Sequence, residues 1–318
     1  MENYVYLTST GNLGYVQIEE NLFYFYPYKP HINCHVGVRG WRQELWVLRF
    51  NTGVESSKPA SQSEIKDALG KFLTQEYHQG KVLVTEIRAV NDAGSYYPRM
   101  NFGEPGLSYL QVKTKERADE TRSFENIFQG LTEIFRTLEP EPGNFNAYGN
   151  SIRELLIIAC TEVEYLLKSI LRSNIPEINC RNLSTKDYVK ISPILKLNHY
   201  RISLPFYPEL GFFSPFENWN QDQPTASLSW YCAYNSVKHD RGNSKNKATL
   251  EMLINAIAAI HILLESQYGE ELFEFRYQHT FRTIFHTEKR PEWYFNEINC
   301  PILDREGVIW NKQKNHSR

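Results

Sequence analysis

The hydrophobic pattern of this chain changes its period part-way along the sequence. In the first 51 residues apolar and aromatic positions alternate with polar ones, which is typical of half-buried β-strands. The alternation is clearest at 15–18 and 22–26, and 46–50 ends a further predicted strand. β-branched content predicts two more strands at 81–90 and 106–114. The first part of the chain is therefore expected to be strand-rich.

One helix is predicted among these strands. Ser61 is followed three residues later by Glu64, the spacing of a capping box at a helix start. Ile65, Leu69 and Phe72 then supply an apolar stripe at helical spacing, and Gly80 is expected to end this helix. Together these elements predict a small mixed α+β domain.

Helical period dominates the second part. The longest predicted helix has an apolar stripe that recurs every three or four residues, and two packed helices are predicted near residue 240. We expect Gly242 to end the first of these two and Gly269 to end the second. The sequence predicts helices at 123–138, 147–172 and 226–268, a shorter one at 184–197 interrupted by Pro193, and a packed loop at 200–219.

A proline- and glycine-rich linker divides the two parts. Residues 139–143 contain Pro140, Pro142 and Gly143, which cannot continue a helix. We therefore expect an α+β domain at 1–140 and an all-α helical bundle at 141–318. The helix at 123–138 is assignable to either side. The C-terminal extension has short extended pieces around a turn at 304–307.

Composition indicates a soluble protein of a reducing compartment. The formal net charge is −2, so a nucleic-acid surface would have to be a local patch. The 5 cysteines are scattered without a C-x-x-C pair, which favours free thiols and a cytoplasmic location. No signal peptide begins the chain, and its apolar runs fall short of the roughly 20 residues that cross a bilayer.

No cofactor or metal ion is expected. His31, Cys34 and His35 lie close together, but no second pair of ligands accompanies them at a recognisable spacing, which favours a chance grouping on a strand. The chain also has no glycine-rich phosphate loop, no G-x-S-x-G and no H-E-x-x-H.

A polar cluster at the end of the first helix of 226–268 is the candidate site. Asn235 and His239 are one helical turn apart, with Lys238 between them and Arg241 just beyond. Lys245 and Lys247 continue the positive charge and are candidate RNA contacts. A simpler interpretation stays open, because cations at a helix C-terminus are favoured by the helix dipole alone.

Two charged residues of the longest helix are candidates for supporting roles. Glu162 lies on the flank of the apolar stripe, where a carboxylate needs a partner, and Lys238 or Arg241 could supply it. We therefore predict that Glu162 lies within ion-pairing reach of Lys238, His239 or Arg241. Arg153 is expected to bridge to a neighbouring helix or to polar groups on the side of Glu164, or to reach the site.

The helix IRELLIIACTEVEYLLKSIL, followed later by YNSVKHDR, resembles the HEPN superfamily of helical prokaryotic toxins, phage-defence proteins and RNases. The resemblance covers roughly residues 145–269. Catalytic members place an arginine a few residues before a histidine, which here would be His239. The corresponding earlier positions at 232–235 hold no arginine, and Arg241 follows the histidine instead.

The resemblance implies metal-independent RNA cleavage by a homodimer. His239 would act as the general acid or base, Asn235 would orient the imidazole or the ribose, and Lys238 and Arg241 would hold the phosphate. The alternative hypothesis is a non-catalytic interaction module, in which the bundle forms dimers or docks a protein partner while the N-terminal domain senses a ligand. The missing arginine favours the module, and the dense polar cluster favours an RNA-binding or RNA-cleaving effector in stress response or phage defence.

Overall fold

The computed structural model describes most of the chain. The described residues are 2–11, 13–19, 21–27, 37–50, 60–90, 115–174, 182–268, 272–273, 283–291, 302–304 and 307–309. They belong to two compact units with separate hydrophobic cores. Each unit is described by itself below.

The first unit is built on an antiparallel sheet with strand order β4-β3-β2-β1-β5. The strand predictions near 15–18, 22–26 and 81–90 are confirmed. Alternate residues such as Tyr4, Tyr6 and Phe23 turn inward and are almost fully buried. The strands are β1 (Glu2–Thr8), β2 (Leu13–Glu19), β3 (Leu22–Pro27), β4 (Gly37–Gly40) and β5 (Val84–Val90).

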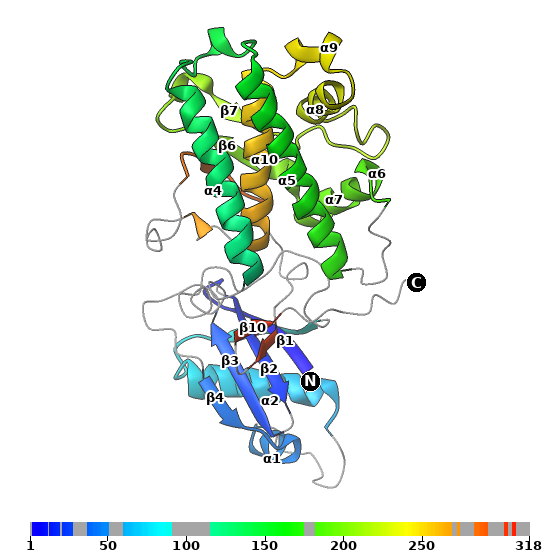
Figure 1. Ribbon diagram of the computed structural model, residues 1–318. Helices are drawn as coiled ribbons and strands as arrows, with labels where there is room; N and C mark the ends of the chain where they lie inside the picture. The colour runs from blue at the N-terminus through cyan, green and yellow to red at the C-terminus, as the bar shows by residue number, and fades with distance from the viewer. Residues whose placement is uncertain are drawn as a thin grey trace. The chain divides into compact units, whose positions relative to one another are not determined.

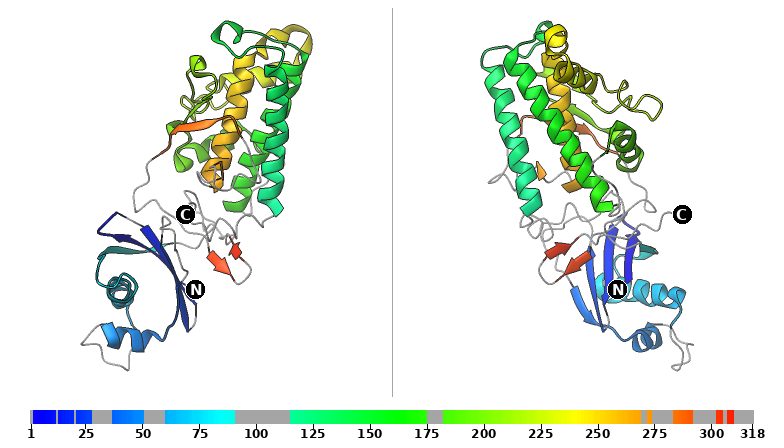
Figure 2. Two further views of the ribbon diagram at one scale, coloured as in Figure 1. Left: turned by 90° about the vertical axis from the view of Figure 1, so that its left-hand side faces the viewer. Right: turned by 45° about the vertical axis from the view of Figure 1, so that its right-hand side comes forward.

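Helix α2 (Gln62–Phe72) packs against one face of this sheet (Figure 2) and continues into a π-helical turn, η1 (Leu73–Tyr77). It starts with the predicted capping box: the Ser61 backbone N–H donates to Glu64 Oε2 at 2.7 Å, and the Glu64 N–H donates to Ser61 Oγ at 3.3 Å. The predicted apolar stripe is buried against the sheet.

Residues 46–50 form the end of a helix, α1 (Gln43–Phe50), so the strand predicted there is wrong. Trp46 and Phe50 are one helical turn apart and stack with ring centroids at 5.3 Å, and Trp46 also meets Phe72 edge-on at 4.7 Å. A short apolar run fits either period, and packing on α2 selects the helical one.

The second unit is a helical bundle around α4 (Lys115–Phe135), α5 (Asn150–Asn174) and α10 (Leu250–Tyr268), which lie side by side in Figure 1. Its core takes Phe124 and Leu131 from α4, Leu156 and Val163 from α5, and the part of α10 from Ala256 to Leu264, which is buried on all sides. The overall class is thus α+β, with a strand-rich first unit and a helical second unit.

The boundary between the units differs from the predicted one at residue 140. The second unit takes residues from Val112 onward, because α4 buries its apolar stripe against α5 and α10. Two short strands late in the chain, β9 (Ile302–Asp304) and β10 (Gly307–Ile309), pair antiparallel with each other and group with the first unit. The strand predicted at 106–114 lies outside the described residues.

A chain of short elements covers one side of the bundle. The helix predicted at 184–197 is interrupted, but the break lies before Pro193: the turn Val189–Ile191 separates α6 (Thr185–Tyr188) from α7 (Ser192–Leu195), and Pro193 lies in the first turn of α7. The segment 200–219 packs on the bundle through Leu204, Phe216 and Trp219. It also contributes β6 (Arg201–Ser203) and β7 (Phe212–Phe213), which form a sheet of order β7-β6-β8 with β8 (His286–Lys289).

The apolar segment of helix α10 is longer than the sequence analysis predicted. By length and composition, Leu250–Gln267 could cross a membrane, but 83% of this segment is buried inside the protein. Its apolar character is therefore that of a core helix surrounded by other helices.

A buried polar network fixes β8 to α10. Glu265 Oε2 accepts a hydrogen bond from Thr287 Oγ1 at 2.5 Å, and Glu265 Oε1 accepts one from Arg290 Nε at 2.6 Å. His261 Nε2 lies 3.0 Å from Thr287 Oγ1, and its ring stacks on Phe273 with centroids 4.0 Å apart. Residues far apart in the sequence thus share one desolvated cluster.

Candidate functional site

Helix α8 (Ser229–His239) carries the polar cluster. Trp230, Tyr234 and Val237 follow helical spacing and are buried in the bundle core, and Trp230 Nε1 donates to the Pro215 carbonyl at 3.0 Å. The same spacing turns Asn235, which is half-buried, and His239, which is exposed, to the opposite side. In the described part of the chain, neither of these two side chains has a hydrogen-bond partner.

The predicted end of α8 at Gly242 is wrong, because the helix ends at His239. Asp240 leaves helical geometry with φ −135° and ψ 69°, and its carboxylate accepts from the Asn243 N–H at 3.3 Å. Asp240 therefore caps a new short helix, α9 (Arg241–Ser244), which contains Gly242. The Asp240 carboxylate is hydrogen-bonded to Asn243, so the negative charge of the cluster lies at the start of α9.

Two exposed lysines flank His239. With about 100° of rotation per helical residue, Lys238 lies on one side of the Asn235–His239 face and Ser236 on the other. Lys247 returns to α8 from the turn η6 (Lys245–Lys247), where its Nζ is 3.4 Å from Ser236 Oγ. On the helix surface, the position of Lys238 and that of Ser236, which Lys247 contacts, therefore lie on opposite sides of the position of His239.

Tyr234 holds Lys238 in place. Lys238 Nζ donates to Tyr234 Oη at 2.7 Å, and this hydrogen bond is the main cause that raises the pKa of Lys238 above its ordinary value. Lys238 therefore stays charged across the physiological range. Lys245 is also exposed, whereas Arg241 lies at the start of α9 with its side chain outside the described part.

A side-chain hydrogen bond joins α8 to α5. Tyr231 Oη donates to Glu164 Oε1 at 2.7 Å, and Lys168 Nζ lies 3.6 Å from Glu164 Oε2. Burial, reinforced by this hydrogen bond, raises the pKa of Tyr231 far above its ordinary value. Burial likewise raises the pKa of the Cys160 thiol on the same α5 face. Tyr231 thus stays a neutral hydrogen-bond donor, and Cys160 stays a protonated thiol.

Glu162 has another partner than two of the three predicted for it. Its side chain hydrogen-bonds with Ser123 of α4, and no ion pair with Lys238 or His239 is present among the described side chains, while the side chain of Arg241 lies outside them. Glu162 is two residues from Glu164 and so points to a different face of α5. The carboxylate that meets α8 is that of Glu164.

Arg153 lies on the α5 face that also carries Cys160 and Glu164, seven and eleven residues further along. Only 8% of its side chain is exposed, and its Nη2 pairs with the neighbouring Glu154 Oε1 at 3.1 Å. Its Nη1 is buried and has no hydrogen-bond partner among the described residues. The expected bridge to another helix is therefore absent for the described residues.

Glu162 leads to a prediction about stability. Burial is the main cause that raises its pKa, so the folded state favours the protonated carboxyl. A raised carboxyl pKa means that the wild type loses stability as the pH rises from the unfolded value of about 4.5 through the folded value. Glu162→Gln should therefore match the wild type in acid and be more stable, by about 1 kcal/mol or less, at pH 7. Urea unfolding at pH 4 and pH 7 measures this difference, and a less stable Gln variant at pH 7 would contradict it.

Sequence reasoning named the exposed residues of the candidate site and did not name the buried residues that contact them. Glu164, Tyr231 and Tyr234 sit within apolar stripes, where they resemble core positions. The available signal was spacing: Glu164 follows Cys160 by four residues, and Lys238 follows Tyr234 by four. Spacing alone does not show which neighbouring helix each of these pairs faces.

No group of three or more His, Cys, Asp or Glu side chains suited to a metal ion is present in the described part of the chain. His31, Cys34 and His35 lie outside it. No family model, no curated protein and no solved structure matches this chain. Functional inference therefore depends on the geometry of the site.

Proposed function

We propose that the second unit is a HEPN-like bundle that binds RNA through the C-terminal end of α8 and cleaves it without a metal ion. The observation that supports this proposal is that His239, Lys238 and Lys247 are all exposed at the end of α8, where Lys247 contacts Ser236 and Asn235 lies one turn before His239. A helix C-terminus repels an anion, so these lysines and Lys245 must outweigh it. Asp240 weakens them less than a free carboxylate would, since it caps α9.

The chemistry needs three things from the protein. The ribose 2′-OH must lose a proton, the negative charge on the phosphorus oxygens must be stabilised, and the 5′ oxygen must gain a proton. His239 would act in proton transfer, because an imidazole titrates near neutral pH. Lys238 and Lys247 would bind the non-bridging oxygens, and Asn235 would orient the ribose.

RNA binding gives the first test of this function. A fluorescent single-stranded RNA, titrated by anisotropy in EDTA, should bind the wild type more weakly as salt rises, because each phosphate contact releases counterions. Replacing Lys238 and Lys247 together with alanine should reduce the slope of log K against log salt by about 1.4, from roughly 0.7 per lost contact. Equal slopes for the wild type and this double variant would exclude a phosphate site here.

Exposed lysines elsewhere on the second unit supply the matched control. Lys186 on α6 and Lys289 on β8 are exposed and distant in sequence from α8. Changing both to alanine removes the same net charge. A loss of binding equal to that of the Lys238 and Lys247 variant would indicate attraction by total charge and no defined site.

The alternative function, a non-catalytic dimerisation or docking module, is favoured by a separate observation. On the outer face of α5, Ile158 is 54% exposed and Tyr165 is 44% exposed, at positions seven residues apart that share that face. A homodimer through this bundle would cover them. Sedimentation velocity at micromolar concentration tests it: a dimer that Ile158→Glu converts to monomer, without RNA binding, supports the module.

A further inference from the structure

A polar pocket lies at the end of the five-stranded sheet that carries the turn between β2 and β3. The start of β1, this turn and the start of α1 meet there. The volume of the pocket is about 400 Å³, within the range of roughly 300–1,000 Å³ that is usual for small-molecule sites. Its lining residues are Glu2, Ile18, Asn21, Trp41, Arg42, Gln43 and Glu44. Segments that are distant in the sequence therefore form one pocket.

The start of α1 forms one wall of this pocket. The Trp41 backbone N–H donates to the Asn21 carbonyl, and Trp46 Nε1 donates to the Gly40 carbonyl at 2.5 Å, which fixes the chain between β4 and α1. Backbone N–H groups in the first turn of a helix have no acceptor within the helix, and their partial positive charge favours an anion. Arg42, just before α1, adds a full positive charge. This wall is therefore suited to a carboxylate.

The indole of Trp41 is a second and independent indication of a ligand. Trp41 is 2% exposed, and its ring lies edge-on to Phe23 with centroids 5.6 Å apart and stacks with Trp46 at 5.7 Å. Trp41 lines the pocket, yet its Nε1–H has no hydrogen-bond partner among the described residues. A buried donor without an acceptor is costly and rare in folded proteins. An oxygen atom of a bound molecule can supply the missing acceptor.

Opposite charges line this pocket without pairing with each other. Arg42 has no ion pair with a described residue, although Glu2 and Glu44 line the same pocket. The Glu2 carboxylate accepts a hydrogen bond from Tyr4 Oη at 2.6 Å, and a carboxylate can accept several more. The pocket therefore offers separate positions for a negative group and a positive group of one molecule.

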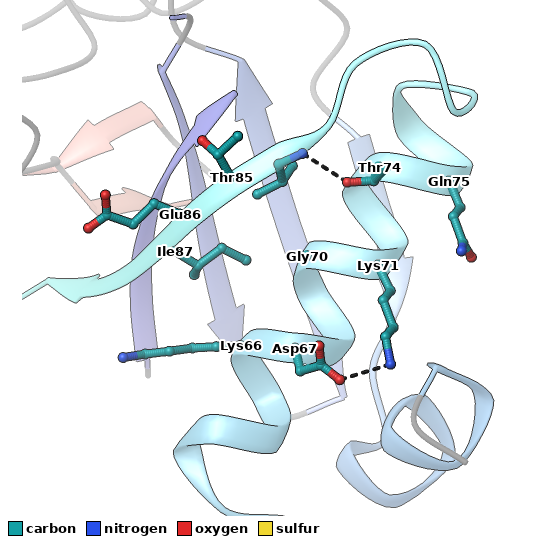
Figure 3. Close-up of a pocket in the computed structure, with 10 residues that line it drawn as sticks. Lys66, Asp67, Gly70, Lys71, Thr74, Gln75, Thr85, Glu86 and Ile87 are labelled. Atoms are coloured by element: carbon teal, nitrogen blue, oxygen red, sulfur yellow. Dashed lines mark hydrogen bonds and ion pairs between the residues drawn. The ribbon is translucent and has the colours of Figure 1, made fainter. Parts of the chain in front are cut away.

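A groove between α2 and β5 in the same unit differs in this respect (Figure 3). There Lys71 Nζ pairs with Asp67 Oδ2 at 2.9 Å, so these two charges neutralise each other within the protein. None of the residues that line this groove has a buried polar side-chain atom without a hydrogen-bond partner. A buried donor that needs an acceptor thus distinguishes the pocket beside α1.

We propose that the pocket beside α1 binds a free amino acid. The carboxylate of the ligand lies at the N-terminus of α1, where Arg42 and the Trp41 indole donate hydrogen bonds to it, and its ammonium group lies beside Glu2 and Glu44. A zwitterion fits this pocket better than a simple anion, because the two glutamates repel a ligand that has no positive group. The site belongs to the first unit, goes beyond the proposed RNA function and does not depend on it.

Isothermal titration calorimetry of the full chain with each standard amino acid tests this proposal. At least one amino acid should bind. Its carboxamide lacks the negative charge and its N-acetyl derivative lacks the positive charge, so each should bind about tenfold more weakly or worse, a change of about 1.4 kcal/mol. The absence of binding by every amino acid, or equal binding of the carboxamide and the N-acetyl derivative to that of the parent, would overturn the proposal.

An exposed arginine of β4 provides the matched control for the pocket. Arg42→Ala should weaken binding about tenfold, whereas Arg39→Ala, outside the pocket, should leave the affinity unchanged. In an NMR spectrum of the labelled protein, the signal of the Trp41 indole proton should move downfield on binding, because this proton gains an acceptor. Wild-type affinity in Arg42→Ala, or an unmoved Trp41 signal, contradicts the proposal. His239→Ala should bind the amino acid normally, so a failure of RNA cleavage leaves this result separate.

Discussion

Replacing His239 with alanine is expected to lower the rate of RNA cleavage in EDTA by about 10²–10⁴-fold, the usual contribution of a positioned acid or base. RNA affinity should change little, because Lys238 and Lys247 supply the phosphate contacts and remain in place. The readout is single-turnover cleavage of a labelled RNA with protein in excess, which separates the chemical step from binding.

His199 provides the matched control for this variant. It is an exposed histidine of the same unit, in the turn after α7, and lies away from α8 in the sequence. His199→Ala should cleave RNA at the wild-type rate. Equal rates for the His239 variant and the wild type would remove His239 from the reaction, and a wild type that neither binds nor cleaves RNA would favour the interaction module.

Replacing Glu265 with alanine should destabilise the second unit by about 3–5 kcal/mol. Its side chain is 2% exposed and accepts hydrogen bonds from both Thr287 and Arg290. Removing one member of a buried charged pair leaves its partners without compensation. Urea unfolding followed by circular dichroism measures the loss, and Glu217→Ala, at an exposed position of the same unit, should change stability by less than about 0.5 kcal/mol.

The same network predicts how stability changes with pH. Thr287 gives its hydroxyl hydrogen to Glu265, so it must accept from His261 Nε2, and the buried His261 Nδ1 has no hydrogen-bond partner in the part of the chain that the structure describes. This arrangement requires a neutral imidazole, and burial lowers the pKa of His261. Burial alone would raise the pKa of Glu265, but its hydrogen bonds and the charge of Arg290 hold it below the usual value.

Both shifts act in the same direction. A histidine with a lowered pKa loses its contribution as the pH falls below its unfolded value near 6.5, and a carboxyl with a lowered pKa does so from near 4.5 downward. The wild type should therefore lose stability progressively below pH 6.5, and Glu265→Gln should lose less between pH 4.5 and pH 3. A Glu265→Ala variant as stable as the wild type at pH 7 would contradict the assigned network.

Local patterns determined much of the fold. The Ser61–Glu64 capping box, the alternating strands β2 and β3, and the stripes of α5 and α10 follow from contacts within one element, or from one face meeting a core. For the same reason the sequence located the polar end of α8, since residues that do not pack must face away from those that do.

The tertiary structure alone decided which side chains and segments contact each other. Residues 46–50 fit two periods, and contact with α2 made them helical. Glu162 and Glu164 look alike in sequence, but a rotation of about 200° between them directs one toward α4 and the other toward Tyr231. Two partners of Glu265, Thr287 in β8 and Arg290 just after it, lie more than 20 residues further along the chain. Such pairings depend on how separate elements pack, and no periodicity within a single element carries that information.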